Sequence, residues 1–132
     1  MATLVGYTSG TITSGSNNNV YDIVLGTALY IPAEYAVTSV EFSRFGLTNL
    51  TTSKTILLGF TGDTDAYVAS GAAVTTTDLN NGTPVIVSVG SHNVCTSNLT
   101  LAIDTASGNI TAGQIRVKVR YVKIPMLADK KY

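Results

Sequence analysis

The sequence is poor in the residues that most enzymes and disulfide-stabilised proteins use. It has no tryptophan, one histidine and one cysteine, and only 12% of its 132 residues are charged. A single cysteine excludes an intramolecular disulfide. No apolar run approaches the roughly 18 residues of a membrane span, and no basic and then apolar leader begins the chain. We therefore expect synthesis in a cytoplasm without export and no contact with a membrane.

The one histidine gives little support for catalysis or for zinc binding. A hydrolytic dyad would have to combine His92 with Ser91, Ser97 or Cys95, and neighbours in one short loop seldom present a nucleophile and a base to each other. His92 and Cys95 have the spacing of half a zinc site, but a second pair of strong ligands is missing. We expect no enzyme activity and no cofactor, and interpret His92 as a surface-loop residue.

Two further features are weak candidates for binding sites. Asp63 and Asp65 alternate in a glycine-containing turn, and carboxylate oxygens suit calcium, but a calcium site normally gathers six or more oxygens. Capping of the turn by these aspartates is the simpler interpretation. Tyr35 and Tyr67 are the candidates for a sugar-binding platform, although a chain without tryptophan offers few of the aromatic side chains that such a platform needs.

What the chain does contain favours strands and tight turns. Threonine, serine, asparagine and glycine together supply 52 residues, and hydrophobic residues make up 45% of the chain. This mix disfavours helices, while the hydrophobic fraction is high enough to offset the entropy lost on ordering. A chain of this length can bury one core without disulfides or metals, so we expect one compact unit.

Short apolar segments with a period of two recur along the chain. Turns are expected at 30–34, 61–65 and 104–109, and one helical turn at 67–73. Six to eight strands without amphipathic helices predict an all-β fold, an antiparallel β-sandwich of jelly-roll or immunoglobulin-like kind. The expected strands are 20–25, 36–45, 55–60, 85–89, 99–103 and 115–121.

The pattern divides the chain into three parts. Residues 1–19 are predicted to form an N-terminal arm or edge strand followed by a polar loop, and 20–125 to form the β-sandwich domain. Residues 126–132 form a basic C-terminal tail. The alternation in the first segment is too weak to decide whether it joins the sheet edge or reaches a neighbouring subunit.

The strand at 115–121 has the clearest pattern. Apolar side chains at 115, 117, 119 and 121 alternate with cations at 116, 118 and 120, which puts the two sets on opposite faces. Residues 116–132 carry six bases and one acid, whereas residues 1–115 carry two bases and seven acids. The cationic end is interpreted either as a docking surface for an acidic partner or as a solvated strand face that resists edge-to-edge aggregation.

Nucleic acid is not an expected partner, because the cations are not interleaved with exposed aromatic side chains and the chain is neutral overall. A protein partner is the remaining interpretation of the docking surface. The candidate contact residues are Arg116, Lys118, Arg120, Lys123, Lys130 and Lys131.

Three stretches follow one another in an order that carries a family resemblance. They are VYDIVLGTALYIPAEYAVTSVEF at 20–42, ILLGFTGDTDAYVASGAAV at 56–74 and LTLAIDTASGNITAGQIRVKVRYVK at 99–123. Strand, proline-containing bend, hydrophobic strand, glycine and aspartate stretch, and a TAG turn before a last strand resemble small structural proteins from the head-gene module of tailed bacteriophages. Glu34 stands where the Pro-Ala-Gly turn of that family has glycine.

The resemblance implies a head decoration, cement or head-fibre protein without enzyme activity, which acts as a homo-oligomer, often a trimer, on the capsid surface. Its expected partners are the major capsid protein and further copies of itself, with assembly in the host cytoplasm and a final place in the virion. The alternative is a receptor- or glycan-binding module of a phage fibre.

Overall fold

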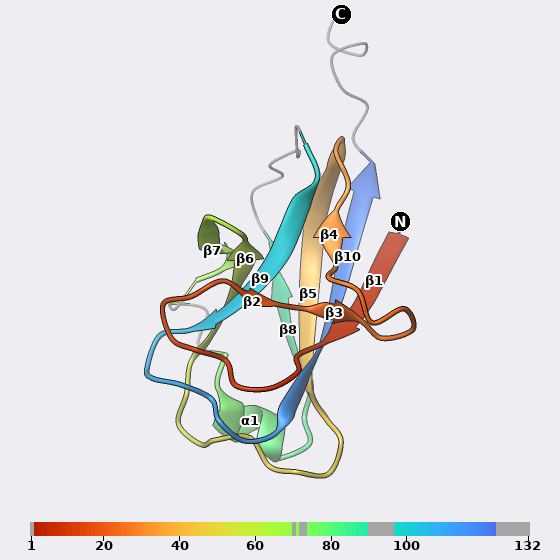
Figure 1. Cartoon of the computed structure of the whole chain (residues 1–132). Helices are drawn as coiled ribbons and strands as arrows, with labels where there is room; N and C mark the ends of the chain where they lie inside the picture. Colours follow the sequence, from red (N-terminus) through yellow and green to blue (C-terminus); the bar gives the residue numbers. More distant parts are fainter. Residues whose placement is uncertain (1, 70, 72–73, 90–96, 124–132) are drawn as a thin grey trace, which may run out of the picture.

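The fold is a sandwich of two antiparallel sheets, with a short helix, α1 (Thr76–Asn80), at one end (Figure 1). The computed structural model describes residues 2–69, 71, 74–89 and 97–123. The predicted all-β sandwich is confirmed. These residues form ten strands rather than six to eight, because three of the ten are only two residues long.

The first sheet has the order β3-β1-β10-β5-β8. Its last strand in the sequence, β10, is central: it pairs with β1 on one side and with β5 on the other. The interpretation of its cations as protection of a sheet edge is therefore wrong, because β10 has no free edge. The bounds are β1 (Ala2–Tyr7), β3 (Tyr21–Asp22), β5 (Tyr35–Phe45), β8 (Val85–Ser88) and β10 (Gln114–Lys123).

The second sheet has the order β2-β9-β6-β7, and β4 adds a short pairing to β9. Residues 61–65 were expected as one turn, but the turn ends at Gly62 and Asp63 already begins β7. The turn expected at 104–109 also starts later than predicted, because Asp104 and Thr105 belong to β9. The bounds are β2 (Asn18–Asn19), β4 (Tyr30–Ile31), β6 (Ile56–Phe60), β7 (Asp63–Val68) and β9 (Leu99–Thr105).

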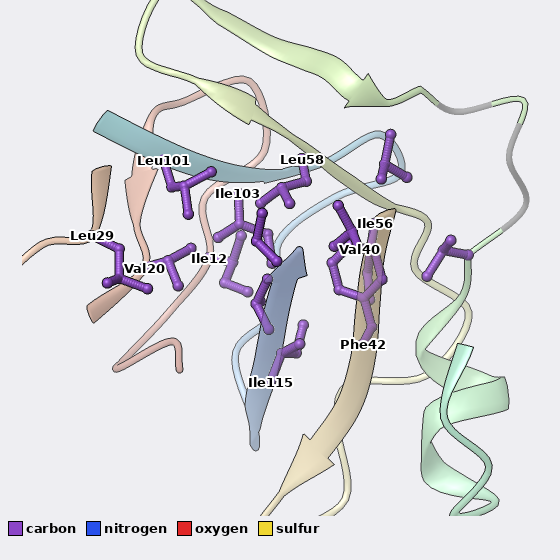
Figure 2. Close-up of a cluster of buried hydrophobic side chains, with 14 of the residues drawn as sticks. Ile12, Val20, Leu29, Val40, Phe42, Ile56, Leu58, Leu101, Ile103 and Ile115 are labelled. Atoms are coloured by element: carbon purple, nitrogen blue, oxygen red, sulfur yellow. The ribbon is translucent and has the colours of Figure 1, made fainter. Parts of the chain in front are cut away.

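The core lies between the sheets and contains the residues that the alternation assigned to it (Figure 2). Side chains of β9 are buried at five successive positions, Leu101–Thr105, whereas those of β10 are buried alternately from Ile115 to Val119, as the period of two predicts. Each buried apolar side chain contributes about 1.5–3 kcal/mol by leaving water. The completely buried ones include Val40, Phe42, Ile56, Leu58, Leu101, Ile103, Ile115, Val117 and Val119.

Asp104 is a buried carboxylate that ties the loop after β1 to the second sheet. Its Oδ1 accepts hydrogen bonds from the N–H of Gly15 at 2.8 Å and from its neighbour Thr105 at 2.7 Å, and its Oδ2 accepts one from the Thr64 hydroxyl at 2.9 Å. Burial of a charge is tolerated only with such partners. The aspartate is therefore a structural residue of the sandwich.

The prediction of a strand at 20–25 is wrong beyond Asp22, where β3 ends. The Asp22 carboxylate accepts hydrogen bonds from the N–H groups of Val24 and Leu25 at 2.7 and 2.8 Å, and this local bonding closes a turn instead of continuing the strand. Gly26 completes the turn with a φ of 72°, which glycine adopts without strain. Three apolar side chains are consequently placed in a loop rather than in the core.

The helical turn predicted at 67–73 is wrong at its start, whereas Gly71 has 3₁₀-helical structure and residues 70, 72 and 73 lie outside the described residues. Tyr67 and Val68 belong to β7, and the helix begins eight residues later. The Thr75 hydroxyl caps it by accepting a hydrogen bond from the N–H of Asp78, while Leu79 is buried against the core. Thr75 and Asp78 have the spacing of a helix cap, a pattern that the sequence contained.

The N-terminal strand is bonded within its own chain. β1 pairs with β10 along its whole length. Just past its end, the N–H of Thr8 donates to the carbonyl of Ile115 and the Thr8 hydroxyl accepts from the N–H of Ile115, both at 2.9 Å. β1 is therefore a structural neighbour of the central strand.

Glu34 occupies a backbone conformation that favours glycine. Its φ is 73°, and the N–H of Tyr35 donates to the carbonyl of Pro32 at 3.3 Å, which makes Glu34 the third residue of a tight turn. A side chain in this left-handed region costs about 1–2 kcal/mol. Its ion pair with Lys123, at 3.8 Å between half-exposed side chains, offsets only a small part of this free-energy cost.

We predict that Glu34→Gly raises the free energy of unfolding by about 0.5–1 kcal/mol, because relief of backbone strain exceeds the entropy that glycine loses on folding. Urea denaturation measures the change. Glu34→Ala is the matched control: it removes the same ion pair but keeps the strained backbone, so it should give no gain. Equal stabilisation by both variants would mean that the strain is not the cause.

Candidate interaction face

The solvent side of the first sheet is the surface on which the predicted contact residues gather. We call it the outer face. Because Ile115, Val117 and Val119 of β10 point into the core, Arg116, Lys118 and Arg120 lie on the opposite side. The register adds alternate residues of the neighbouring strands to this side. They are Thr3, Val5 and Tyr7 of β1, Ser39, Glu41 and Ser43 of β5, and Ile86 and Ser88 of β8.

The three cations run along the middle of the outer face. In the register, Arg116 lies between Tyr7 and Ser43, Arg120 lies between Thr3 and Ser39, and Lys118 lies between Val5 and Glu41. Glu41 is the one acid on this face among the described residues. Three cations against one acid give the outer face a positive field, which suits an acidic partner.

The arginines are available for binding. Arg116 and Arg120 are exposed and Lys118 is half-buried. In the part of the chain that the structure describes, no carboxylate lies within 4.0 Å of the charged group of any of the three. Their backbones belong to a strand paired on both sides, so their Cα atoms are spaced about 6.6 Å apart along the strand.

Lys123, the other described residue among the predicted contacts, does not join this set. Lys123 shares the side of β10 that carries Tyr121, because it lies two residues further along the strand, and its ammonium group contacts Glu34. Lys130 and Lys131 lie outside the described residues. The structure therefore brings together Arg116, Lys118 and Arg120, and it separates Lys123 from them.

A row of aromatic rings borders the outer face, and the sequence interpretation missed it. The ring of Tyr7 lies 5.4 Å from that of Phe45 and 6.3 Å from that of Tyr21, measured between centroids. Phe45 and Tyr7 come from strands on either side of β10, so only the register brings them together. Half-exposed aromatic side chains beside an arginine are frequent in protein interfaces.

Asp63 and Asp65 lie at the exposed start of β7. A hydrogen bond with the Asp65 side chain, then partial desolvation and the negative charge of Asp65, raise the pKa of Asp63. Among the described residues, no group of three or more His, Cys, Asp or Glu side chains could hold a metal ion.

The remaining candidates are separated. Tyr35 belongs to the first sheet, where its ring lies 5.0 Å from that of Tyr121, and Tyr67 belongs to the second, where it lies 6.0 Å from Phe60. His92 and Cys95 lie outside the described residues. Over the ranges that the structure covers, no helix is long and apolar enough to cross a membrane.

Comparison with known proteins identifies a shared fold. The sequence matches no family model and no curated protein. The structure resembles a chain in the capsid asymmetric unit of cyanophage Pam1, with a TM-score of 0.58 and 22% identity over 90% of this chain and 83% of that one. A chain in the acid-stable capsid structure of Helicobacter pylori bacteriophage KHP30 gives a TM-score of 0.48 and 15% identity over 94% and 95% of the two chains.

The outer face should tolerate loss of its arginines. We predict that Arg116→Gln and Arg120→Gln each change the free energy of unfolding by less than about 0.5 kcal/mol, because neither side chain is buried. Val117→Ala, on the same strand but in the core, should cost about 1.5–3 kcal/mol. Urea denaturation compares the three. Arginine variants as costly as Val117→Ala would make these residues part of the fold rather than free for a partner.

Proposed function

We propose that this protein is a non-enzymatic structural protein of a bacteriophage virion and that its outer face attaches it to the capsid shell as a decoration or cement protein. The observation that carries the proposal is the row of three cations on a strand held from both sides. The fold shared with a chain of the cyanophage Pam1 capsid asymmetric unit supports the virion assignment.

The charge of the outer face favours an acidic partner, for which we propose the major capsid protein. Arg116 and Arg120 present guanidinium groups that bind carboxylates through paired hydrogen bonds. Contacts of this kind on an exposed surface weaken as salt screens them, over a distance of about 8 Å at physiological ionic strength. Attachment through the outer face should therefore be weaker at higher salt.

The size of the outer face favours attachment as a symmetric oligomer. Four strands spaced about 4.8 Å apart and five residues of about 3.3 Å each cover roughly 300 Å². A stable interface takes about 800 Å² from each partner. Several copies that bind together would supply the missing area and gain avidity. We propose a homo-oligomer, with a trimer as the expected form.

Attachment can be measured by co-sedimentation with particles assembled from the major capsid protein of the same genome. The wild type should bind saturably, at a fixed number of copies per shell. The triple variant Arg116→Gln, Lys118→Gln, Arg120→Gln should bind at least about tenfold more weakly, because each charged hydrogen bond contributes about 1.5–3 kcal/mol before screening. Raising the salt should weaken the wild type more than the variant.

The control variant carries the same change in net charge at a distance from the outer face. Thr11→Glu, Thr52→Glu and Thr83→Glu add three negative charges in exposed loops. This variant should bind like the wild type if the position of the charges matters. Equal weakening by both variants would show a general charge effect, and unchanged binding of the glutamine variant would remove the outer face from the proposal.

Deletion of residues 2–13 is not a clean test of an attachment arm. It would remove β1, the hydrogen-bonded neighbour of the central strand. If the wild type binds no particles yet forms a stable oligomer, the receptor- or glycan-binding module of a phage fibre becomes the better proposal. Screening against host-cell polysaccharides would then be the next measurement.

A further inference from the structure

Strand β8 has a free edge in the part of the chain that the structure describes. It is the last strand of the first sheet, and among the described strands it pairs with β5 alone. The N–H of Val89 donates to the carbonyl of Thr38 at 3.0 Å, which continues the register of β5 and β8. Because residues that bond to the partner strand alternate along an antiparallel ladder, Val87 and Val89 bond to β5. The N–H and C=O groups of Ile86 and Ser88 therefore point away from the sheet.

The sequence of β8 leaves this edge open to another strand. Proteins protect the edges of sheets with charged side chains, with proline or with very short strands. In the second sheet, the edge strand β7 carries Asp63 and Asp65, and at the other edge of the first sheet β3 has only two residues. β8 has four residues, none of residues 83–89 is charged, and Ile86 is 61% exposed. β8 therefore carries neither a charge nor a proline that would keep another strand away.

We propose that β8 pairs antiparallel with β8 of a second copy of this chain, so that the first sheets of the two copies become continuous. The strand suits a copy of itself, because no like charges meet when two identical uncharged strands lie side by side. In this pairing Ile86 lies opposite Ser88 of the partner subunit, and the two copies of Val87 meet at the two-fold axis. The outward N–H and C=O groups of Ile86 and Ser88 are then all hydrogen-bonded between the copies.

The residue before the strand selects this register. A pairing centred on Ile86 instead of Val87 would place Ser88 opposite Pro84 of the partner subunit. Proline has no N–H to donate, so one hydrogen bond at each end of the pairing would be lost. The register centred on Val87 leaves no such gap.

The contact is small, because each copy contributes one short strand, whereas a stable interface takes about 800 Å² from each partner. It should therefore form most readily where another interaction already concentrates the copies, as the proposed attachment to a capsid shell would do. A two-fold contact cannot close a trimer, so in a trimeric protein it would join copies of neighbouring trimers. That role on a shell rests on the proposed function, whereas the pairing of β8 can be tested without a shell.

Disulfide trapping of single cysteines tests the pairing and its register. Cys95 is first replaced by serine, and either Val87→Cys or Ile86→Cys is then introduced. At the proposed axis the two Cα atoms of position 87 are about 4.5 Å apart, a distance that a disulfide bridges. Those of position 86 are diagonal neighbours about 7–8 Å apart, which is too far. Mild oxidation of the concentrated, purified protein should therefore cross-link Val87→Cys at least about fivefold faster than Ile86→Cys.

Random collisions between copies give the opposite order of rates, because Ile86 is exposed and Val87 is half-buried. Cross-linking of Ile86→Cys at the same rate as Val87→Cys, or faster, would overturn the proposal. The measurement uses the purified protein alone. Its outcome is therefore independent of whether the outer face attaches to a capsid shell.

Two lysines on the edge provide a second test, made in the chain that carries Val87→Cys. Ile86→Lys together with Ser88→Lys places lysine opposite lysine in the proposed register, and both positions are exposed, so the fold should be kept. Like charges directly opposite each other destabilise strand pairing, so cross-linking should slow by about fivefold or more. Thr11→Lys with Thr52→Lys adds the same charge in exposed loops and should leave the rate unchanged. Equal rates in the two lysine variants would overturn the pairing.

Discussion

The pairing of β10 on both sides is the constraint on which the rest of the structure depends. Residues 114–123 pair with β1 on one side and with β5 on the other, so the first sheet is complete only when this strand is in place. Its inward side chains, Ile115, Val117 and Val119, are completely buried. The same pairing determines on which side its cations lie. The position of β10 therefore determines both its buried side chains and its exposed ones.

The sequence was sufficient for the strands whose side chains alternate. In much of β5 and β10, apolar and polar residues alternate. Burial of the apolar set then determines which side of each strand faces the core. It was insufficient at 20–25, where six residues are apolar enough for a strand but the Asp22 carboxylate accepts hydrogen bonds from the N–H groups of Val24 and Leu25. A local hydrogen bond of this kind competes with the hydrogen bonds between paired strands, and the amino-acid composition does not show which of the two forms.

One part of the candidate site followed from the sequence and another part did not. Alternation alone placed Arg116, Lys118 and Arg120 together, because it acts within one strand. The aromatic border of Tyr7 and Phe45 depends on which strands flank β10, and these residues are 38 positions apart in the sequence. Lys123 shows the converse: it belongs to the same cationic run but takes the other side of the strand and contacts Glu34.

The arrangement also makes binding and stability separable on one strand. A change at position 116 or 120 alters a side chain in water, whereas a change one residue away alters the core. Arg120 and the next residue, Tyr121, are separated in the same way, because they point to opposite sides of β10. A partner on the outer face would therefore leave the side chains on the inner side of β10 undisturbed.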